Sequence, residues 1–165
     1  MMLGVLCGLF AGSMAFADYL VVRQEHQGHV VPVLEKLGFT KEEEKSIQDE
    51  IASRSGTVEG KPRFVEVFAW KGSQRRSPRE LVGEAARLFK DLTEGSPETT
   101  GFELIAKVPG VEVSGKDDDG QFTILRLAVI GTETVAISYS GPLPRTDADT
   151  STFNAICATG IELRK

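Results

Sequence analysis

The sequence predicts an α+β fold, with helices packed against a largely antiparallel sheet. Two segments with alternating apolar residues, 122–130 and 134–140, flank a two-residue turn, a pattern typical of a β-hairpin. A helix with clear start signals lies earlier, near residues 77–92. Apolar residues make up 41% of the chain and charged residues 26%, which is ordinary for a globular protein.

The N-terminal segment has the features of a signal peptide. Residues 1–17 contain no charged side chain, and the apolar run Leu3–Met14 is shorter than the roughly 20 residues that span a bilayer. The segment ends in Ala15-Phe16-Ala17, the small-x-small pattern that signal peptidase accepts. We expect cleavage before Asp18 and export to the periplasm or the extracellular space, with residues 18–165 forming a single α+β domain and no integral membrane segment.

Charge and cysteine content narrow the classes of partner. The formal net charge is −5, which argues against general binding to nucleic acid or to anionic membranes. Cleavage would remove Cys7 and leave Cys157 alone, so no internal disulfide is expected. Cys157 follows Phe153 and Ile156 on a predicted helix, a setting that favours a buried, unreactive thiol.

The N-terminal part, residues 18–55, is predicted to be a strand followed by helices. A strand covers Tyr19–Val22, and a helix at His29–Leu37 ends at Gly38. The capping-box pattern Thr40–Glu43 predicts a second helix over Lys41–Ser53. The Gly- and Pro-containing stretch Ser55–Pro62 is interpreted as a linker to the main part, residues 63–165.

The main part is predicted to begin with a central strand, Arg63–Trp70. Both of its faces are largely apolar, which predicts cover on both sides. One face carries Phe64, Glu66, Phe68 and Trp70, and the other carries Val65, Val67 and Ala69.

The next helix has the clearest signals in the chain. Ser77 is the predicted N-cap, Pro78 the first helical residue, and Glu80 completes a capping box. Apolar residues then follow with the helical period at Leu81, Val82, Ala85, Leu88, Phe89 and Leu92.

The last third is predicted to be mostly strands. Strands at Phe102–Val108 and Val111–Ser114 are separated by a turn at Pro109-Gly110, and Lys116–Gly120 forms another turn. The following hairpin is predicted to turn at Gly131-Thr132, which pairs Ile130 with Glu133. A short helix near Asp149–Ala158, a stop at Gly160 and an apolar segment, Ile161–Leu163, complete the chain.

This order of elements resembles small exported domains of the Mog1/PsbP-like fold. The matching stretches are Val108–Gly115, Asp119–Phe122, Arg126 and Phe153–Ile156, within about residues 78–163. The resemblance implies a binding or accessory protein, and it carries no shared catalytic residues.

A second resemblance covers about residues 19–108. Leu20–Arg23 followed by helices, then Arg63–Trp70 and another helix, is similar to dimeric α+β barrel (ferredoxin-like) domains. Some members of that superfamily are small monooxygenases or haem-degrading enzymes. This resemblance implies an enzyme that acts on a small hydrophobic substrate, with a pocket lined by Phe64, Glu66, Phe68 and Trp70.

Basic residues gather at the start of the best-defined helix. Arg75, Arg76 and Arg79, together with Lys71, surround a helix N-terminus, where backbone N–H groups favour an anion. Arginines add bidentate donors for such a ligand. The alternative is a solvated basic loop balanced by nearby carboxylates, Glu80 and Glu84.

Two charged residues lie on predicted apolar strand faces. Glu66 lies between Phe64 and Phe68, and Arg126 is a lone charge on one hairpin face. If their strands adjoin, Glu66 and Arg126 are expected to form a buried pair. Trp70 is expected to line an apolar ligand pocket with Phe68, or else to belong to the core.

No pattern predicts a metal, a cofactor or a catalytic residue. His26 and His29 lack the further ligands that a metal site needs. Asp117–Gly120 fails as an EF-hand loop, because Gly115 and Arg126 fall where acidic ligands belong. We therefore expect an exported, non-enzymatic binding or accessory domain whose partner is a protein or a small anionic or apolar ligand.

Overall fold

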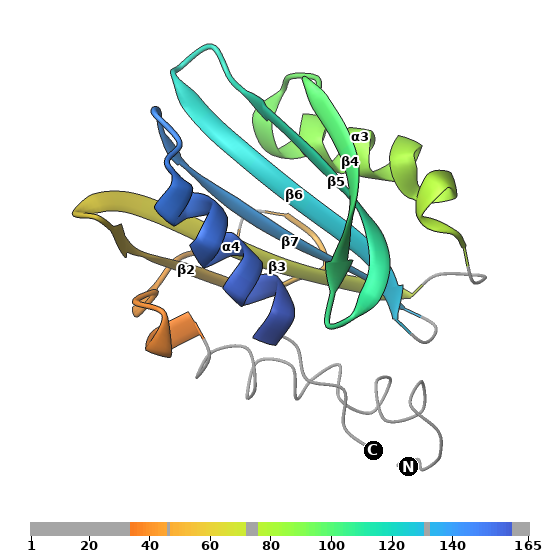
Figure 1. Cartoon of the computed structure of the whole chain (residues 1–165), viewed down its shortest axis with the longest axis horizontal. Helices are drawn as coiled ribbons and strands as arrows, with labels where there is room; N and C mark the ends of the chain where they lie inside the picture. Colours follow the sequence, from red (N-terminus) through yellow and green to blue (C-terminus); the bar gives the residue numbers. More distant parts are fainter. Residues whose placement is uncertain (1–33, 46, 72–75, 131–132, 160–165) are drawn as a thin grey trace.

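A computed structural model of the chain describes residues 34–45, 47–71, 76–130 and 133–159. These residues form a seven-stranded antiparallel sheet with helices on both faces (Figure 1), which confirms the predicted α+β class. The strand order is β1-β2-β3-β7-β6-β5-β4. The strands are β1 (Lys41–Glu42), β2 (Glu50–Val58), β3 (Lys61–Lys71), β4 (Thr99–Ile105), β5 (Val108–Lys116), β6 (Gln121–Ile130) and β7 (Glu133–Pro142).

Several predictions fall outside the described residues. They are the signal peptide at residues 1–17, the strand Tyr19–Val22, the two histidines, Arg75, the turn Gly131-Thr132, Gly160 and the terminal segment Ile161–Leu163.

Each face of the sheet carries one long helix. The 3₁₀ turn η1 (Pro78–Leu81) leads into α3 (Val82–Thr93) on one face, and α4 (Asp147–Thr159) covers the other (Figure 1). The predicted cap is confirmed, because the Ser77 hydroxyl accepts a hydrogen bond from the Glu80 N–H. No helix in the described part of the chain is long and apolar enough to cross a membrane.

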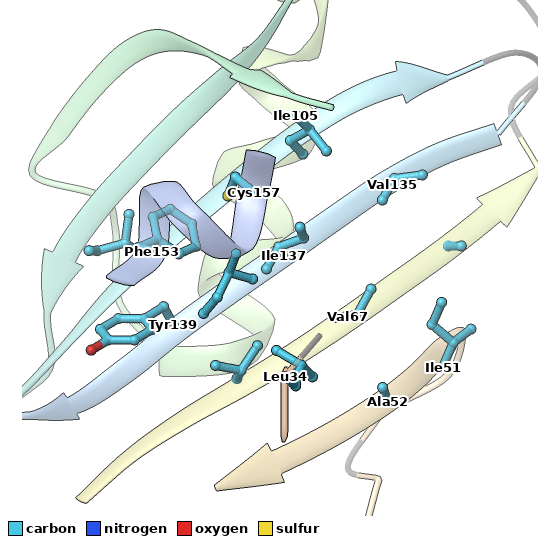
Figure 2. Close-up of a cluster of buried hydrophobic side chains, with 14 of the residues drawn as sticks. Leu34, Ile51, Ala52, Val67, Ile105, Val135, Ile137, Tyr139, Phe153 and Cys157 are labelled. Atoms are coloured by element: carbon cyan, nitrogen blue, oxygen red, sulfur yellow. The ribbon is translucent and has the colours of Figure 1, made fainter. Parts of the chain in front are cut away.

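Alternation along the strands divides the core into two clusters. The cluster under α4 includes side chains from β2, β3, β6, β7 and α4 (Figure 2), among them Ala52, Val67, Ile124, Ile137 and Phe153. The cluster under α3 includes Phe68, Leu81, Phe89, Leu125 and Ala136. We call these the α4 face and the α3 face of the sheet.

The predicted central strand and long hairpin are both confirmed. β3 lies between β2 and β7, with Val65, Val67 and Ala69 on the α4 face and Phe68 on the α3 face. β6 pairs with β7 in the predicted register, with Ile130 opposite Glu133.

The predicted helix over Lys41–Ser53 is wrong. Lys41 and Glu42 form β1, and Glu50–Val58 form β2, which pairs with β3 along almost its whole length. The capping-box pattern is a local signal and carries no information about burial, whereas Ile51, Ala52 and Ser53 are all buried in the sheet. Tertiary strand pairing outweighs the local helical signal here.

The predicted linker at Ser55–Pro62 is also wrong, because these residues form the tip of the β2–β3 hairpin. Val58 pairs with Lys61 across a two-residue turn. Both turn residues, Glu59 and Gly60, have positive φ angles of 53° and 79°, as a type I′ turn requires.

The predicted turn at Pro109-Gly110 lies three residues too late. The β4–β5 hairpin turns at Ala106 and Lys107, whose φ angles are 50° and 68°. Gly110 instead lies within β5, at a point where this strand passes close to β6. A Cβ at this position would come within 2.1 Å of the Leu127 carbonyl oxygen, so a glycine is required for close approach rather than for a turn.

Candidate functional site

The α3 face contains an open pocket of about 330 Å³ between α3, the end of β3 and the segment before β2. Phe68 and Trp70 line it, as the sequence predicts, whereas Phe64 and Glu66, which were expected in the same pocket, do not. Ile47 and Leu88 add aliphatic surface. Trp70 is half-buried, while Phe68 is fully buried. The pocket is therefore an apolar depression in which the indole of Trp70 is partly exposed to solvent.

Charged groups surround this apolar lining. Three carboxylates, Asp49, Glu84 and Asp91, line the pocket together with the guanidinium of Arg87. Glu84 accepts two hydrogen bonds from Nη2 of Arg76, at 2.5 and 2.7 Å. Arg87 is exposed and makes no ion pair within the described part of the chain. Because carboxylates outnumber cations in this lining, a multiply charged anion is disfavoured, and a single acidic group on an apolar ligand would have to meet Arg87.

The predicted basic cluster is divided in the structure. Arg76 is held by Glu84, whereas Arg79 is exposed at the start of η1. Arg75 lies outside the described residues. Of the two arginines that the structure describes, Arg76 therefore has its charge balanced by a carboxylate of the adjoining helix.

The predicted pair between Glu66 and Arg126 does not form. Glu66 lies on β3 and Arg126 on β6, and β7 separates these strands. The two residues also lie on opposite faces of the sheet. Glu66 is two residues from Phe68 and shares the α3 face with it, whereas Arg126 is two residues from Ile124 and shares the α4 face. Glu66 instead accepts a hydrogen bond of 3.2 Å from the Ser138 hydroxyl.

Arg126 is a structural residue that links three strands to α4. It donates to Glu112 on β5, to the Leu104 carbonyl on β4 at 2.9 Å, and to Asn154 on α4 at 3.0 Å. Its guanidinium also lies 4.9 Å from the ring centroid of Phe153. With its donors engaged and its side chain buried, Arg126 has no open face for a ligand.

A second buried polar network, around Arg63, was not predicted as a site. Arg63 is 1% exposed, and its Nε and Nη2 donate to the two carboxylate oxygens of Asp149 at 2.7 and 3.1 Å. The Tyr139 hydroxyl donates to the same carboxylate at 2.5 Å. Thr146, at the start of α4, also donates to Asp149 through its N–H and its hydroxyl. This network fastens the N-terminus of α4 to β3 and β7.

The network shifts the pKa values of its members in opposite directions. Burial opposes ionisation of Asp149, but the hydrogen bonds from Arg63, Tyr139 and Thr146 outweigh it and hold the pKa of this carboxyl well below its usual range. Burial, followed by the adjacent carboxylate, raises the pKa of Tyr139. The groups are enclosed and satisfy one another, so the network serves stability.

Two sequence signals could have identified this network. Arg63 lies two and four residues before Val65 and Val67, so it shares their apolar strand face. A charged residue on a buried face requires a partner. Thr146 and Asp149 also have the spacing of a capping box.

Cys157 is buried on the α4 face, as predicted. Burial raises the pKa of its thiol to about 12, so the thiolate is scarce at neutral pH. Its environment does not support nucleophilic chemistry.

No group of three or more potential metal ligands occurs among the described residues. The carboxylate of Asp117 instead stabilises its own turn, accepting hydrogen bonds from the N–H groups of Asp119 and Gln121. No protein-family model matches the chain, and a search of curated proteins finds no match.

Proposed function

We propose that this chain is an exported, non-enzymatic binding domain that holds a small, mostly apolar ligand in the pocket on its α3 face. The observation that carries the proposal is the half-buried indole of Trp70 in an open pocket with Phe68. Burying an aromatic or aliphatic ligand against this lining removes apolar surface from water, at roughly 25 cal/mol per Å². A volume of about 330 Å³ suits a ligand at the small end of the usual range.

Arg87 of the pocket is exposed to solvent, whereas the arginines of the other charged sites are buried. Arg63 and Arg126 are enclosed by carboxylates, carbonyls and aromatic rings. Arg87 is exposed beside the aromatic lining, where it would meet a carboxylate or sulfonate on the ligand. The proposed ligand class is therefore an apolar body with one acidic group.

We propose a Mog1/PsbP-like fold for the domain. The sheet continues through β6 and β7, and α4 packs against it, as that resemblance implies. A ferredoxin-like domain would instead be expected to have a four-stranded sheet with Tyr19–Glu25 beside Arg63–Trp70. In the described residues, β3 is flanked by β2 and β7.

Native mass spectrometry of the chain isolated from the exported fraction tests the binding function. We expect a small-molecule adduct that is lost in Ile47→Glu, which places a charge in the apolar lining. Phe64→Glu is the matched control, since Phe64 is 37% exposed on β3 and lies outside the pocket. An adduct retained equally by both variants would show that the pocket is not the site.

The same sample tests export. We expect a mature N-terminus at Asp18, measured by intact mass and N-terminal peptide sequencing. A secreted chain that still begins with Met1 would show that the signal peptide is not cleaved.

A further inference from the structure

The two outer strands of the sheet differ in how well they are protected from pairing. β1 is two residues long, and both Lys41 and Glu42 are exposed and charged. A short, charged edge resists the addition of another strand. β4 forms the other edge and has seven residues, of which Phe102 and Leu104 are 54% and 50% exposed. β4 is therefore the edge open to pairing.

The hairpin turn determines which backbone groups of β4 point outward. In a two-residue turn, the carbonyl of the residue before it accepts from the N–H of the residue after it, so Ile105 and Val108 form a hydrogen-bonded pair. Hydrogen-bonded and non-hydrogen-bonded pairs alternate along an antiparallel ladder. The backbone groups of Thr100, Phe102 and Leu104 therefore point away from β5. Pro109, which has no N–H, pairs with Leu104, consistent with this alternation.

At one end of this edge, two backbone groups already have partners. Arg126 donates to the Leu104 carbonyl, and the Ala106 N–H donates to the Cys157 carbonyl at the end of α4. The N–H and C=O groups of Thr100 and Phe102 have no hydrogen-bond partner within the described part of the chain. The Leu104 N–H also points outward, and the Leu104 carbonyl keeps a second lone pair, so the section that can still pair runs from Thr100 to Leu104 and is centred on Phe102.

We propose that two copies of this chain associate by antiparallel pairing of β4 with β4, on a two-fold axis through the Phe102 pair. In this register each Phe102 faces its counterpart, Thr100 faces Leu104 of the second copy, and Gly101 faces Glu103. The outward groups of Thr100 and Phe102 gain partners, and the exposed aromatic rings cover each other.

Two neighbouring registers are less favourable. An axis at Gly101 would place Leu104 opposite Glu98, which lies outside β4. A two-fold axis at residue 103 would place Glu103 directly opposite its own copy, and like charges opposite each other are destabilising. The axis at Phe102 places a glycine opposite each glutamate instead. The paired segment is short, so the dimer is weak and reversible, in contrast to an obligate interface.

Sedimentation equilibrium of the purified chain over a wide concentration range tests the association. We expect a reversible monomer–dimer equilibrium, with loss of the dimer in Phe102→Lys. Leu143→Lys is the matched control, because Leu143 is 43% exposed but lies outside β4, and this variant should dimerise like the wild type. A wild-type chain that stays monomeric, or a dimer that survives Phe102→Lys, would overturn the proposal.

Disulfide trapping tests the register, in a Cys7→Ser background with Cys157 buried. Directly opposite residues in a hydrogen-bonded pair have Cα atoms about 5.5 Å apart, within disulfide range. Phe102→Cys should therefore cross-link to its own copy, whereas Thr100→Cys, an exposed control on the same strand, should not. Equal cross-linking of both variants would contradict the register. Binding of an added extended peptide by a chain that does not self-associate would assign the edge to another partner and overturn self-pairing.

Discussion

The two faces of the sheet are closed to different degrees. On the α4 face, a bidentate ion pair, a tyrosine hydroxyl and a threonine satisfy one another beneath the start of α4. On the α3 face, α3 leaves the indole of Trp70 and a pocket beside it open. Buried groups that satisfy one another have no capacity left for a ligand. The network on the α4 face therefore serves stability, and the α3 face is the one on which we propose ligand binding.

The largest effect is expected from breaking the network on the α4 face. Asp149→Ala leaves the buried guanidinium of Arg63 without its carboxylate, which should cost about 3–5 kcal/mol in the free energy of unfolding. Urea unfolding followed by circular dichroism measures this loss. Asp147→Ala in the same first helical turn is the control, because Asp147 is exposed. Similar small losses in both variants would contradict a structural role for the network.

Truncation of Phe89, a buried side chain of α3, should lower the free energy of unfolding. Phe89 is fully buried between α3 and the sheet, so Phe89→Ala should cost roughly 3–5 kcal/mol. The same urea measurement compares it with Lys90→Ala, an exposed neighbour on α3. A loss below about 1 kcal/mol would show that Phe89 is not part of the core.

Acid should weaken the network selectively. Because the pKa of Asp149 is lowered in the folded state, its stabilisation is fully present above the ordinary aspartate pKa of about 4 and is lost as the pH falls below it. The difference in unfolding free energy between wild type and Asp149→Asn should therefore be constant near neutral pH and shrink in acid. A difference that stays constant down to about pH 3 would contradict the proposed charge state.

The smallest effect is expected at the start of the helix on the α3 face. The Ser77 hydroxyl accepts from the Glu80 N–H, so Ser77→Ala should cost about 1 kcal/mol. Thermal unfolding should show a modest fall in Tm with ligand binding retained, because Ser77 does not line the pocket. Loss of binding without loss of stability would place Ser77 in the site instead.

The elements predicted well are those whose local and tertiary signals agree. Ser77, Pro78 and the apolar period identified α3, alternation identified β3, and the expectation of a two-residue turn gave the register of β6 with β7. The region 41–62 was mispredicted because its capping pattern is local, while β2 is defined by pairing with β3. Single-sequence patterns do not include that pairing energy.

The candidate site was predicted in part for the same reason. Trp70 and Phe68 were expected to line an apolar pocket, and they do so. Asp49 and Asp91 line the pocket where the segment before β2 lies beside α3. Because residues 41–53 were predicted to be a helix, this proximity could not be anticipated. Arg126 and Glu66 were paired wrongly because strand order cannot be read from alternation alone.

The most direct test of the difference between the two faces uses Trp70, the single tryptophan of the chain. Titration with 1-anilinonaphthalene-8-sulfonate, an apolar probe with one acidic group, should give saturable energy transfer from Trp70 in the folded wild type. Ile47→Glu should abolish the transfer, Arg87→Gln should weaken it, and Phe64→Glu should leave it unchanged. Absence of transfer in the wild type, or equal transfer in all four proteins, would contradict a binding site on the α3 face.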